Sequence, residues 1–508
     1  MGRKTGTVLS FLTIVVEIVS ALFVTPLIIR IFGQAEYGVY TLALSIASYL
    51  SLLDLGVGNA VIRFMTKYKA NGQLEEQRKF LGITSLYYGI VALLIITVGI
   101  GLIMTLPTVF AVGLNNAEIA LAQRLLGVTM LSYAIVIGTL GFFYTAVAYE
   151  NFFITKGFSL ILSIIRIIVM VIALHCGMKS LGVTILHLFV TIISRGFVVI
   201  VVLVKMKLLP TLKNVKISQI KEIVTYSGFI FLQMLATQIN NMADQILIGM
   251  FAASSAFVLA IYGVGSQINH YFNTFGRVIN DVTMPGVVKL VENGATKDIL
   301  TNEMVRIGRL NLTFTGFIWV VFLLVGKQFT TLWAGEINQY SYYVAVILMF
   351  PMVFIFSQTV GTQILCAKNM HKKQSILKLT IVLLNIILTI ILIHWNPLFG
   401  ATIGTFISLL LGDVIVMQWV FKKDIGIQLT EYYKGLYKGI LPSLVISGIV
   451  GGIFTFIKLS GWLGLFTNIL VMFLAYAICM LKFGFNQYER TLLCSINNKL
   501  WGNKNGGQ

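Results

Sequence analysis

Residues Lys205 to Glu222 have the sequence KMKLLPTLKNVKISQIKE, and this basic stretch divides the chain between two long apolar halves. It carries five lysines: Lys205, Lys207, Lys213, Lys216 and Lys221. Lys and Arg between membrane helices stay on the cytoplasmic side, because carrying them across the bilayer is disfavoured. The stretch therefore predicts a cytoplasmic linker over 205–222, which gives the protein both a boundary and an orientation.

The composition on either side of this linker is that of a membrane protein. The 508 residues are 57% hydrophobic and 11% charged, and the mean hydropathy is +0.91. Soluble domains carry about 25% charged residues. Apolar runs of about twenty residues recur along the chain, and each is long enough to cross a hydrocarbon core of about 30 Å. Helices satisfy their own backbone in lipid, so we expect an all-α polytopic membrane protein.

The apolar runs predict about fourteen transmembrane spans, at 7–30, 38–63, 80–106, 121–148, 153–176, 181–204, 223–250, 256–285, 307–332, 341–366, 376–394, 397–420, 436–457 and 462–482. With the N-terminus inside, alternation places 29 of the 37 Lys and Arg on inside segments and five outside. This count assigns Lys and Arg within a few residues of a span end to the adjoining segment, and the other three, Arg166, Arg195 and Arg277, lie in the interiors of spans. This asymmetry favours fourteen spans with both termini in the cytoplasm.

Charge and cysteine usage exclude several classes of function. The net charge of +19 follows from the basic cytoplasmic loops, and an anionic substrate would add to the reason for it. The four cysteines are scattered, without a CxxC pair, so they predict neither a disulfide framework nor a metal site. No Walker A motif or other catalytic constellation occurs in the sequence. We therefore expect a carrier that is not an enzyme and holds no cofactor.

The two halves resemble each other in sequence. Tyr37-Gly38 in EYGVYTLALSI and Tyr262-Gly263 in AIYGVGSQI are 225 positions apart. The segments 148–169 and 367–388 correspond at an offset of 219, and Gly182 in SLGVTILHLFVTIISR matches Gly400 in LFGATIGTFISLLLGD. A duplicated six-span unit gives parallel repeats. We expect an N-terminal lobe at 1–204, a C-terminal lobe at 223–420, two further helices at 421–482 and a cytoplasmic tail at 483–508.

Polar residues form stripes of helical period inside several predicted spans. Ionisable groups at membrane depth are costly and normally face protein or water. Span 8 carries the clearest stripe, Asn269, Asn273, Arg277 and Asn280, with Asp281 one turn after Arg277. These stripes have two interpretations: they join helices, with Arg277 and Asp281 as an i,i+4 pair, or they line a hydrated cavity. The other polar groups of these stripes that we single out are Glu17, Arg166, Arg195, Asn240 and Asp244.

Several motifs resemble those of one known family. They are IFGQAEYGVY, LLDLGVGNAVIRF, the segment DQILIG that begins at Asp244, IYGVGSQI, DVTMP, and QTVGTQILCAKNMHKKQSILKL followed by Asn385 and GATIGT. In this order the chain resembles the polysaccharide biosynthesis transporters. These are the Wzx-type O-antigen and capsule flippases of the multidrug/oligosaccharidyl-lipid/polysaccharide exporter superfamily.

The resemblance implies a MATE-like fold of two six-helix lobes and a flippase in a bacterial cytoplasmic membrane. Its substrate would be undecaprenyl-pyrophosphate-linked oligosaccharide repeat units, moved to the outer leaflet by alternating access through a cationic cavity. Membrane lipid and polysaccharide polymerase or assembly proteins would be its partners. A cation-coupled multidrug exporter and a peptidoglycan-precursor (lipid II) flippase of the same superfamily are the alternatives.

The expected substrate-binding residues are those that suit phosphate and sugar hydroxyls. Arginine binds phosphate through a planar fork of donors, which favours Arg277, followed by Arg166 and Arg195. Amide side chains would bind sugar hydroxyls: Asn240, Asn269, Asn273 and Asn280. Glu17, Asp244 and Asp281 are the candidates for coupling to H⁺ or Na⁺.

Overall fold

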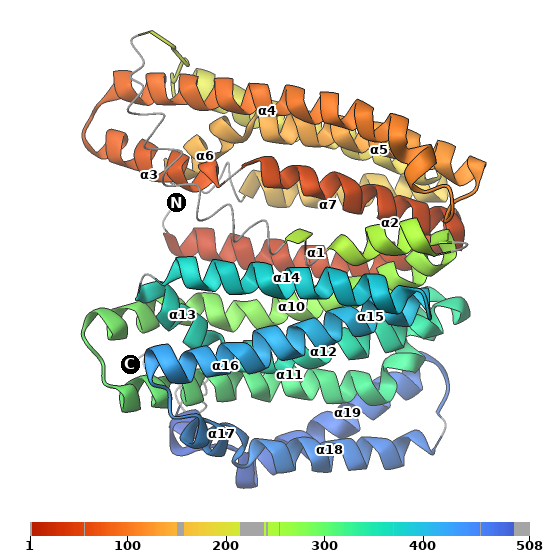
Figure 1. The fold of residues 1–508 in the computed structure, drawn as a ribbon, viewed down its shortest axis with the longest axis vertical. Helices are drawn as coiled ribbons and strands as arrows, with labels where there is room; N and C mark the ends of the chain where they lie inside the picture. The colour runs from red at the N-terminus through yellow and green to blue at the C-terminus, as the bar shows by residue number, and fades with distance from the viewer. Residues whose placement is uncertain are drawn as a thin grey trace, which may run out of the picture. The chain divides into compact units, whose positions relative to one another are not determined.

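A computed structural model describes residues 3–54, 56–149, 157–213, 238–239, 242–252, 255–368, 370–457 and 459–491. Every regular element among them is a helix (Figure 1). The helices form two compact units, one of residues 1–264 and 372–408 and the other of residues 265–371 and 409–508. The lobe boundaries at 204 and 223 that we expect from the repeat stay a prediction.

Unit 1 is built around α5 (Asn116–Gly138), which packs against α2 (Gln34–Ser48), α4 (Leu74–Val109) and α8 (Ser180–Ile200). Figure 1 shows α4 and α5 lying side by side along most of their length. The remaining elements of this unit are α1 (Arg3–Phe32), η1 (Tyr49–Asp54), α3 (Val57–Ala70), α6 (Leu140–Ala148), α7 (Phe158–His175), η3 (Val201–Lys205), the helix Met242–Phe251, the first part of α10 (Ser255–Glu292), α14 (His371–Ile393) and α15 (Pro397–Ser408).

Unit 2 is built around α11 (Lys297–Ala334), which contacts α12 (Ser341–Ser357), α17 (Leu429–Tyr437), α18 (Ile440–Thr455) and α19 (Gly461–Cys479). The remaining elements are the second part of α10, η4 (Glu336–Tyr340), α13 (Thr359–Ala367), η5 (Leu409–Val416), α16 (Met417–Val420), η6 (Phe421–Ile425) and η7 (Met480–Gly484).

The helices have the length and apolarity of membrane spans. Among the described residues, eight helices are long and apolar enough to cross a membrane, and a ninth if α17 and α18, bent by 41°, form one span. On α4, Ile90, Leu93, Ile100 and Met104 are between 52% and 74% exposed. An apolar face of this extent requires lipid as its solvent. The chain is therefore a multi-pass membrane protein, and the count of fourteen spans stays a prediction.

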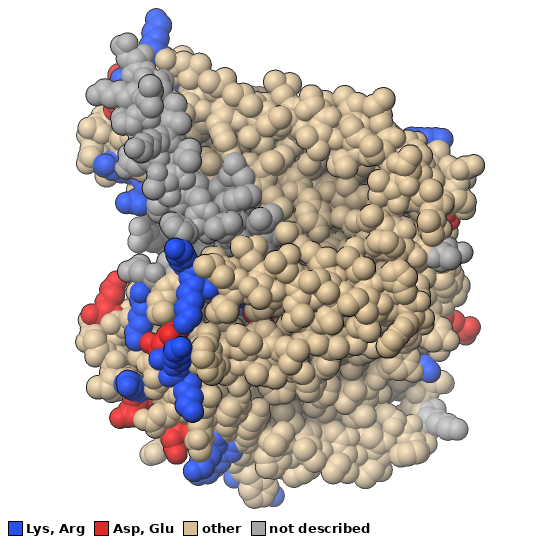
Figure 2. Space-filling model, in the orientation of Figure 1, with Lys and Arg blue, Asp and Glu red and all other residues tan. Residues whose placement is uncertain are grey.

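Charged side chains lie mainly at helix ends. In unit 2, Figure 2 shows Lys and Arg gathered near the end of α16 and beside α17, whereas the sides of the helices are almost wholly uncharged. Lys422, Lys423 and Lys434 belong to η6 and α17. All three are lysines that the orientation argument places on the inside.

The repeat has a counterpart in the positions of two helix breaks. The predicted span 121–148 is broken between α5 and α6 at Thr139, which has φ −104° and ψ 3°. The predicted span 341–366 is broken between α12 and α13 at Gln358, which has φ −104° and ψ 8°. These residues are 219 positions apart, which is the offset found in the sequence. The backbone geometry therefore supports the duplication.

The duplicated Tyr-Gly pairs bring two helices of unit 1 into close contact. A Cβ on Gly38 of α2 would lie 1.7 Å from the carbonyl oxygen of Ala256 in α10. A Cβ on Gly263 of α10 would lie 3.3 Å from the side chain of Thr41 in α2. Ser255 adds two hydrogen bonds to the carbonyl oxygen of Gly113, from its backbone N at 2.8 Å and from its Oγ at 2.9 Å. At Gly38 the backbones of α2 and α10 approach each other directly, because glycine carries no side chain.

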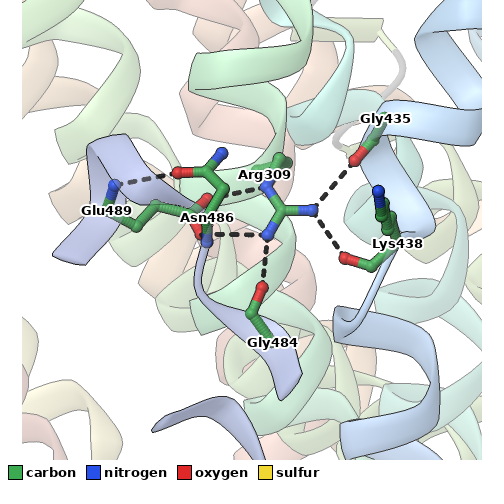
Figure 3. Close-up of polar contacts among 6 residues, drawn as sticks. All are labelled: Arg309, Gly435, Lys438, Gly484, Asn486 and Glu489. Atoms are coloured by element: carbon green, nitrogen blue, oxygen red, sulfur yellow. Dashed lines mark hydrogen bonds and ion pairs between the residues drawn. The ribbon is translucent and has the colours of Figure 1, made fainter. Parts of the chain in front are cut away.

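A buried arginine attaches the last helices to α11 (Figure 3). Arg309 is 3% exposed and donates to both carboxylate oxygens of Glu489. It also donates to three backbone carbonyl oxygens, those of Gly435 at 2.9 Å, Lys438 at 2.7 Å and Gly484 at 2.6 Å. Counting Lys and Arg by segment assigns Arg309 to an inside loop, whereas the structure places it within a helix, with its guanidinium hydrogen bonds made to the chain itself.

Candidate functional site

Asp244 is a buried carboxylate in the helix Met242–Phe251, 2% exposed. Tyr262 donates its hydroxyl to Oδ2 at 2.5 Å, and Thr405 donates to the same oxygen at 2.5 Å. Thr389 approaches Oδ1 at 3.3 Å. The amide oxygen of Asn385 lies 3.2 Å from the Thr389 hydroxyl and 3.0 Å from the Thr405 hydroxyl. All five residues belong to unit 1.

The cluster contains more close oxygen–oxygen contacts than its hydroxyl groups have hydrogens to place in them. Five close oxygen–oxygen contacts join its members, whereas the three hydroxyl groups carry one proton each. With the Asn385 amide oxygen facing both threonines, as here, at least two contacts are left without a hydrogen. A bound proton or a small cation would satisfy them, and one carboxylate with neutral oxygens suits a monovalent ion. The ion-coupling role of Asp244 stays a prediction.

The polar residues on the part of α10 that belongs to unit 2 differ in their exposure and in their hydrogen bonds. Arg277 is exposed, and Asn273, one turn before it, is half-buried. Asn280 is 5% exposed and makes its hydrogen bonds with neighbouring helices. Its amide nitrogen donates to Thr359 at 3.2 Å, and its amide oxygen accepts from Asn311 at 2.9 Å. Asn280 therefore joins neighbouring helices, whereas Asn273 and Arg277 are accessible.

Asn269 and the Asn280 cluster contain buried oxygens without a hydrogen-bond partner in the described part of the chain. They are Asn269 Oδ1, Asn311 Oδ1 and Gln363 Oε1. Gln363 donates through its amide nitrogen to the Asn280 carbonyl oxygen at 2.9 Å. Unpaired buried acceptors are uncommon in proteins and are sites where water or a ligand group binds.

Arg166 and Arg195 both lie in unit 1, on α7 and α8. Arg166 lines a cavity of about 470 Å³ together with His187, Tyr40 and Tyr133. Arg195 lies outside the residues that line this cavity, with its guanidinium carbon 5.1 Å from the centre of the Phe143 ring. The three other predicted site residues cannot be placed: Asn240 and the side chains of Glu17 and Asp281 lie outside the described residues.

The partners of Asp244 were not predicted from the sequence. Tyr262 is 18 positions from Asp244, Thr389 is 145 and Thr405 is 161. A signal for them exists in the motifs, since Tyr262 belongs to IYGVGSQI, Thr405 ends GATIGT and Asn385 precedes it. Only the fold shows that these motifs converge on one carboxylate.

Comparisons with known proteins agree with this architecture. A family model described as polysaccharide biosynthesis protein matches residues 3–291, more than half of the chain. The chain belongs to the polysaccharide biosynthesis protein family. By sequence it is similar to the uncharacterized membrane protein EpsK of Bacillus subtilis (strain 168), with 21% identity over 510 residues and 95% of each chain covered.

Solved structures with this fold include flippases and transporters. The lipid II flippase MurJ in an inward closed conformation matches with a TM-score of 0.70 and 16% identity, covering 97% of this chain and 100% of that one. An inward-facing MATE family multidrug transporter matches with a TM-score of 0.65 and 12% identity, covering 80% of this chain and 99% of that one. The predicted MATE-like fold is confirmed, and so is the predicted polysaccharide biosynthesis family. These two solved structures are a flippase and a transporter rather than enzymes, in line with the prediction for this member of the polysaccharide biosynthesis family.

Proposed function

We propose that this protein is a flippase for undecaprenyl-pyrophosphate-linked oligosaccharide repeat units. It would move them from the cytoplasmic to the outer leaflet of a bacterial cytoplasmic membrane, with both termini in the cytoplasm, for O-antigen, capsule or exopolysaccharide assembly. The observation that carries the proposal is membership of the polysaccharide biosynthesis family together with a polytopic helical fold.

Arg277 is the residue we assign to the pyrophosphate. Its side chain is exposed on α10, and a guanidinium offers paired donors to phosphate oxygens. Asn273 lies one turn away on the same helix, where it would hydrogen-bond a sugar hydroxyl. The polyprenyl chain is too apolar for a polar cavity and would remain in lipid.

Asp244 is the residue we assign to coupling. Its carboxylate has room in its hydrogen-bond pattern for one H⁺ or Na⁺, as the surplus of oxygen contacts indicates. Binding of the ion would change the interaction of the helix Met242–Phe251 with α14 and α15, which carry Thr389 and Thr405. An ion can drive a conformational change only through such a difference in interaction between states.

Complementation tests the assignment. The gene is deleted in its host, and surface polymer and lipid-linked intermediates are measured with the wild-type gene, Arg277→Ala or Arg277→Lys restored. We expect deletion to abolish surface polymer and to accumulate lipid-linked repeat units on the cytoplasmic side. Arg277→Ala should reduce export at least tenfold at wild-type protein levels, and Arg277→Lys should restore part of it because the positive charge returns.

The outcome also separates the alternatives. Unchanged polymer with altered resistance to cationic drugs would move the protein to the multidrug exporters. Accumulation of peptidoglycan precursor, with polymer lost only as a consequence, would move it to the lipid II flippases. Normal export by Arg277→Ala would remove the arginine assignment while leaving the flippase assignment in place.

A further inference from the structure

The cavity beside Arg166 lies within the N-terminal part of unit 1. Residues of α2, α5, α7 and α8 enclose it, and its volume is about 470 Å³. Arg166, Tyr40 and His187 all line the cavity. Among the described residues, no Asp or Glu lines the cavity. Tyr40 and Tyr133 are among the lining residues, together with Thr129, Ser132 and Thr184, whose hydroxyls donate to carbonyl oxygens of their own helices.

The sequence repeat relates this cavity to the Asp244 cluster. Arg166 corresponds to Asn385 at the offset of 219 that aligns 148–169 with 367–388. His187 corresponds to Thr405 at the offset of 218 that matches Gly182 with Gly400. The same two positions of the repeat thus face a carboxylate in the second half and a cavity in the first.

The chemistry of these positions is opposite in the two halves. Asn385 and Thr405 contribute oxygens beside the Asp244 carboxylate, a donor set for a proton or a cation. Arg166 and His187 replace both oxygens with nitrogen groups, and a guanidinium has five N–H donors and no acceptor. A cation would be repelled by Arg166. A carboxylate or phosphate group is the ligand whose geometry a guanidinium matches.

We propose that this cavity binds a small oxyanion, a carboxylate or phosphate group, held by Arg166 with His187 and the tyrosine hydroxyls at its side. The cavity belongs to unit 1, whereas Arg277 belongs to unit 2, and none of the residues that contact Asp244 lines it. The duplicated fold would then hold one site of each charge sign.

Arg195 supplies an independent observation on the same helix. It lies two turns after His187 on the same face of α8, and its Nη1 is buried without a hydrogen-bond partner in the described part of the chain. Leaving a buried charged donor unpaired costs free energy. A second cationic group on the same face favours an anion in this part of the bundle.

Direct binding to the purified full-length protein tests the site. In a neutral detergent, inorganic phosphate and glucuronate are titrated and thermal unfolding is followed, with glucose as the uncharged probe. We expect saturable stabilisation by phosphate or glucuronate and none by glucose. The double variant Arg166→Asn/His187→Thr installs the residues that the second repeat carries at these positions. It should weaken the apparent affinity at least tenfold.

The matched control is Arg124→Gln, which removes one positive charge from an exposed position on α5 and should bind as the wild type does. If the double variant does not fold, Arg166→Lys replaces it, and we expect weaker but measurable binding. Equal stabilisation of all variants, or no stabilisation of the wild type by either anion, would overturn the proposal. The assay measures binding without transport, so its result is independent of the flippase assignment.

A second set of measurements, on protein in lipid nanodiscs, distinguishes two sources of the oxyanion, a lipid headgroup and a sugar. Stabilisation by phosphatidylglycerol over phosphatidylcholine, lost in Arg166→Asn/His187→Thr, would identify a lipid headgroup. Stabilisation by glucuronate in either lipid would identify a carboxylate carried by a sugar. If neither membrane composition nor soluble anion gives an effect that depends on Arg166, the site does not exist.

Discussion

Arg309 and Glu489 form a two-point ion pair inside unit 2, with Nε to Oε1 at 2.7 Å and Nη2 to Oε2 at 2.9 Å. Their side chains are 3% and 4% exposed. The pair lies where α11, the segment between α17 and α18, and the residues after η7 meet. Glu489 is held in turn by Asn486, since each accepts a hydrogen bond from the backbone N of the other, at 2.8 and 2.9 Å.

Glu489→Gln is expected to lower stability strongly, because it leaves the Arg309 charge buried without its partner. Breaking one side of a buried ion pair costs about 3–5 kcal/mol. The measurement is thermal unfolding of purified protein in detergent.

The control for this variant is Glu431→Gln, which removes an exposed carboxylate 3.8 Å from Lys434. Exposed pairs contribute about 0–1 kcal/mol, so its unfolding temperature should stay near that of the wild type. If both variants have the same unfolding temperature, the pair does not hold the last helices in place.

Gly38→Ala is expected to prevent normal packing of α2 against α10. The new Cβ would meet the carbonyl oxygen of Ala256 at 1.7 Å, and a backbone atom cannot rotate away. Overpacking typically costs about 1–3 kcal/mol, and a backbone collision lies at the upper end or beyond. Folded yield and unfolding temperature, measured by size-exclusion chromatography and thermal unfolding, report the effect.

Gly89→Ala makes the same chemical change on α4, where nothing lies within 4 Å of the added atom. In a helix interior alanine is favoured over glycine by about 1 kcal/mol, so this variant should be at least as stable as the wild type. A Gly38→Ala protein that folds as well as Gly89→Ala would show that the helices do not approach each other this closely.

The class of fold could be predicted from the sequence because lipid imposes a simple rule. Apolar runs of sufficient length must be helices, and the offsets near 219 show that they are duplicated. The breaks at Thr139 and Gln358 were not predicted, since neither is a proline or a glycine and each lies within an apolar run. Their common offset becomes informative only once the backbone is seen.

The charged residues of the candidate site could be predicted from the sequence, but the residues that hydrogen-bond to them could not. Asp244 stands out in sequence because a carboxylate inside an apolar span is costly. Thr389 and Thr405 carry no such signal, since hydroxyl residues are common in membrane helices and most donate to their own backbone, as Thr402 does to Leu398. Arg309 was counted with the loop cations because it lies at the start of a predicted span, and its partner Glu489, 180 positions away, could not be paired with it from the sequence.

Tyr88→Phe is expected to destabilise unit 1 more than Tyr87→Phe. Tyr88 is fully buried, and its hydroxyl donates to the Asp54 carboxylate at 2.6 Å. The Tyr87 hydroxyl donates to the uncharged carbonyl oxygen of Leu53 at 3.1 Å. Hydrogen bonds to charged groups contribute about 1.5–3 kcal/mol, and those between neutral groups about 0.5–1.5.

Thermal unfolding of the two phenylalanine variants checks this order, and the adjacent tyrosines control for the loss of one hydroxyl. The larger fall for Tyr88→Phe would assign the Asp54 carboxylate a role in fixing the junction of η1 and α3. Equal falls, or a larger one for Tyr87→Phe, would contradict it.

Asp244→Asn is expected to abolish the response of the protein to its coupling ion while leaving it folded. Asparagine has nearly the same shape and brings its own N–H donors, so the oxygen contacts that lack a proton would be satisfied without an ion. Thr405→Val keeps the side-chain shape but removes one oxygen from the set, and should weaken ion binding at least tenfold. Polymer export by both variants should fall by a similar order, because the ion can no longer shift the equilibrium between states.

The measurement is thermal unfolding of purified protein during two separate titrations, NaCl against choline chloride at fixed pH, and pH at fixed ionic strength without sodium. Saturable stabilisation by Na⁺ that Asp244→Asn removes would identify a sodium site. A response to pH alone, again lost in Asp244→Asn, would identify a proton site, because the remaining groups of the cluster are neutral hydroxyls and an amide that do not titrate near neutrality. Thr402→Val is the matched control, since Thr402 lies in the same helix and donates to the Leu398 carbonyl oxygen at 2.8 Å, away from the carboxylate. If Asp244→Asn retains the wild-type response in both titrations and exports polymer normally, Asp244 is a structural acid, and the energy for transport must enter the protein elsewhere.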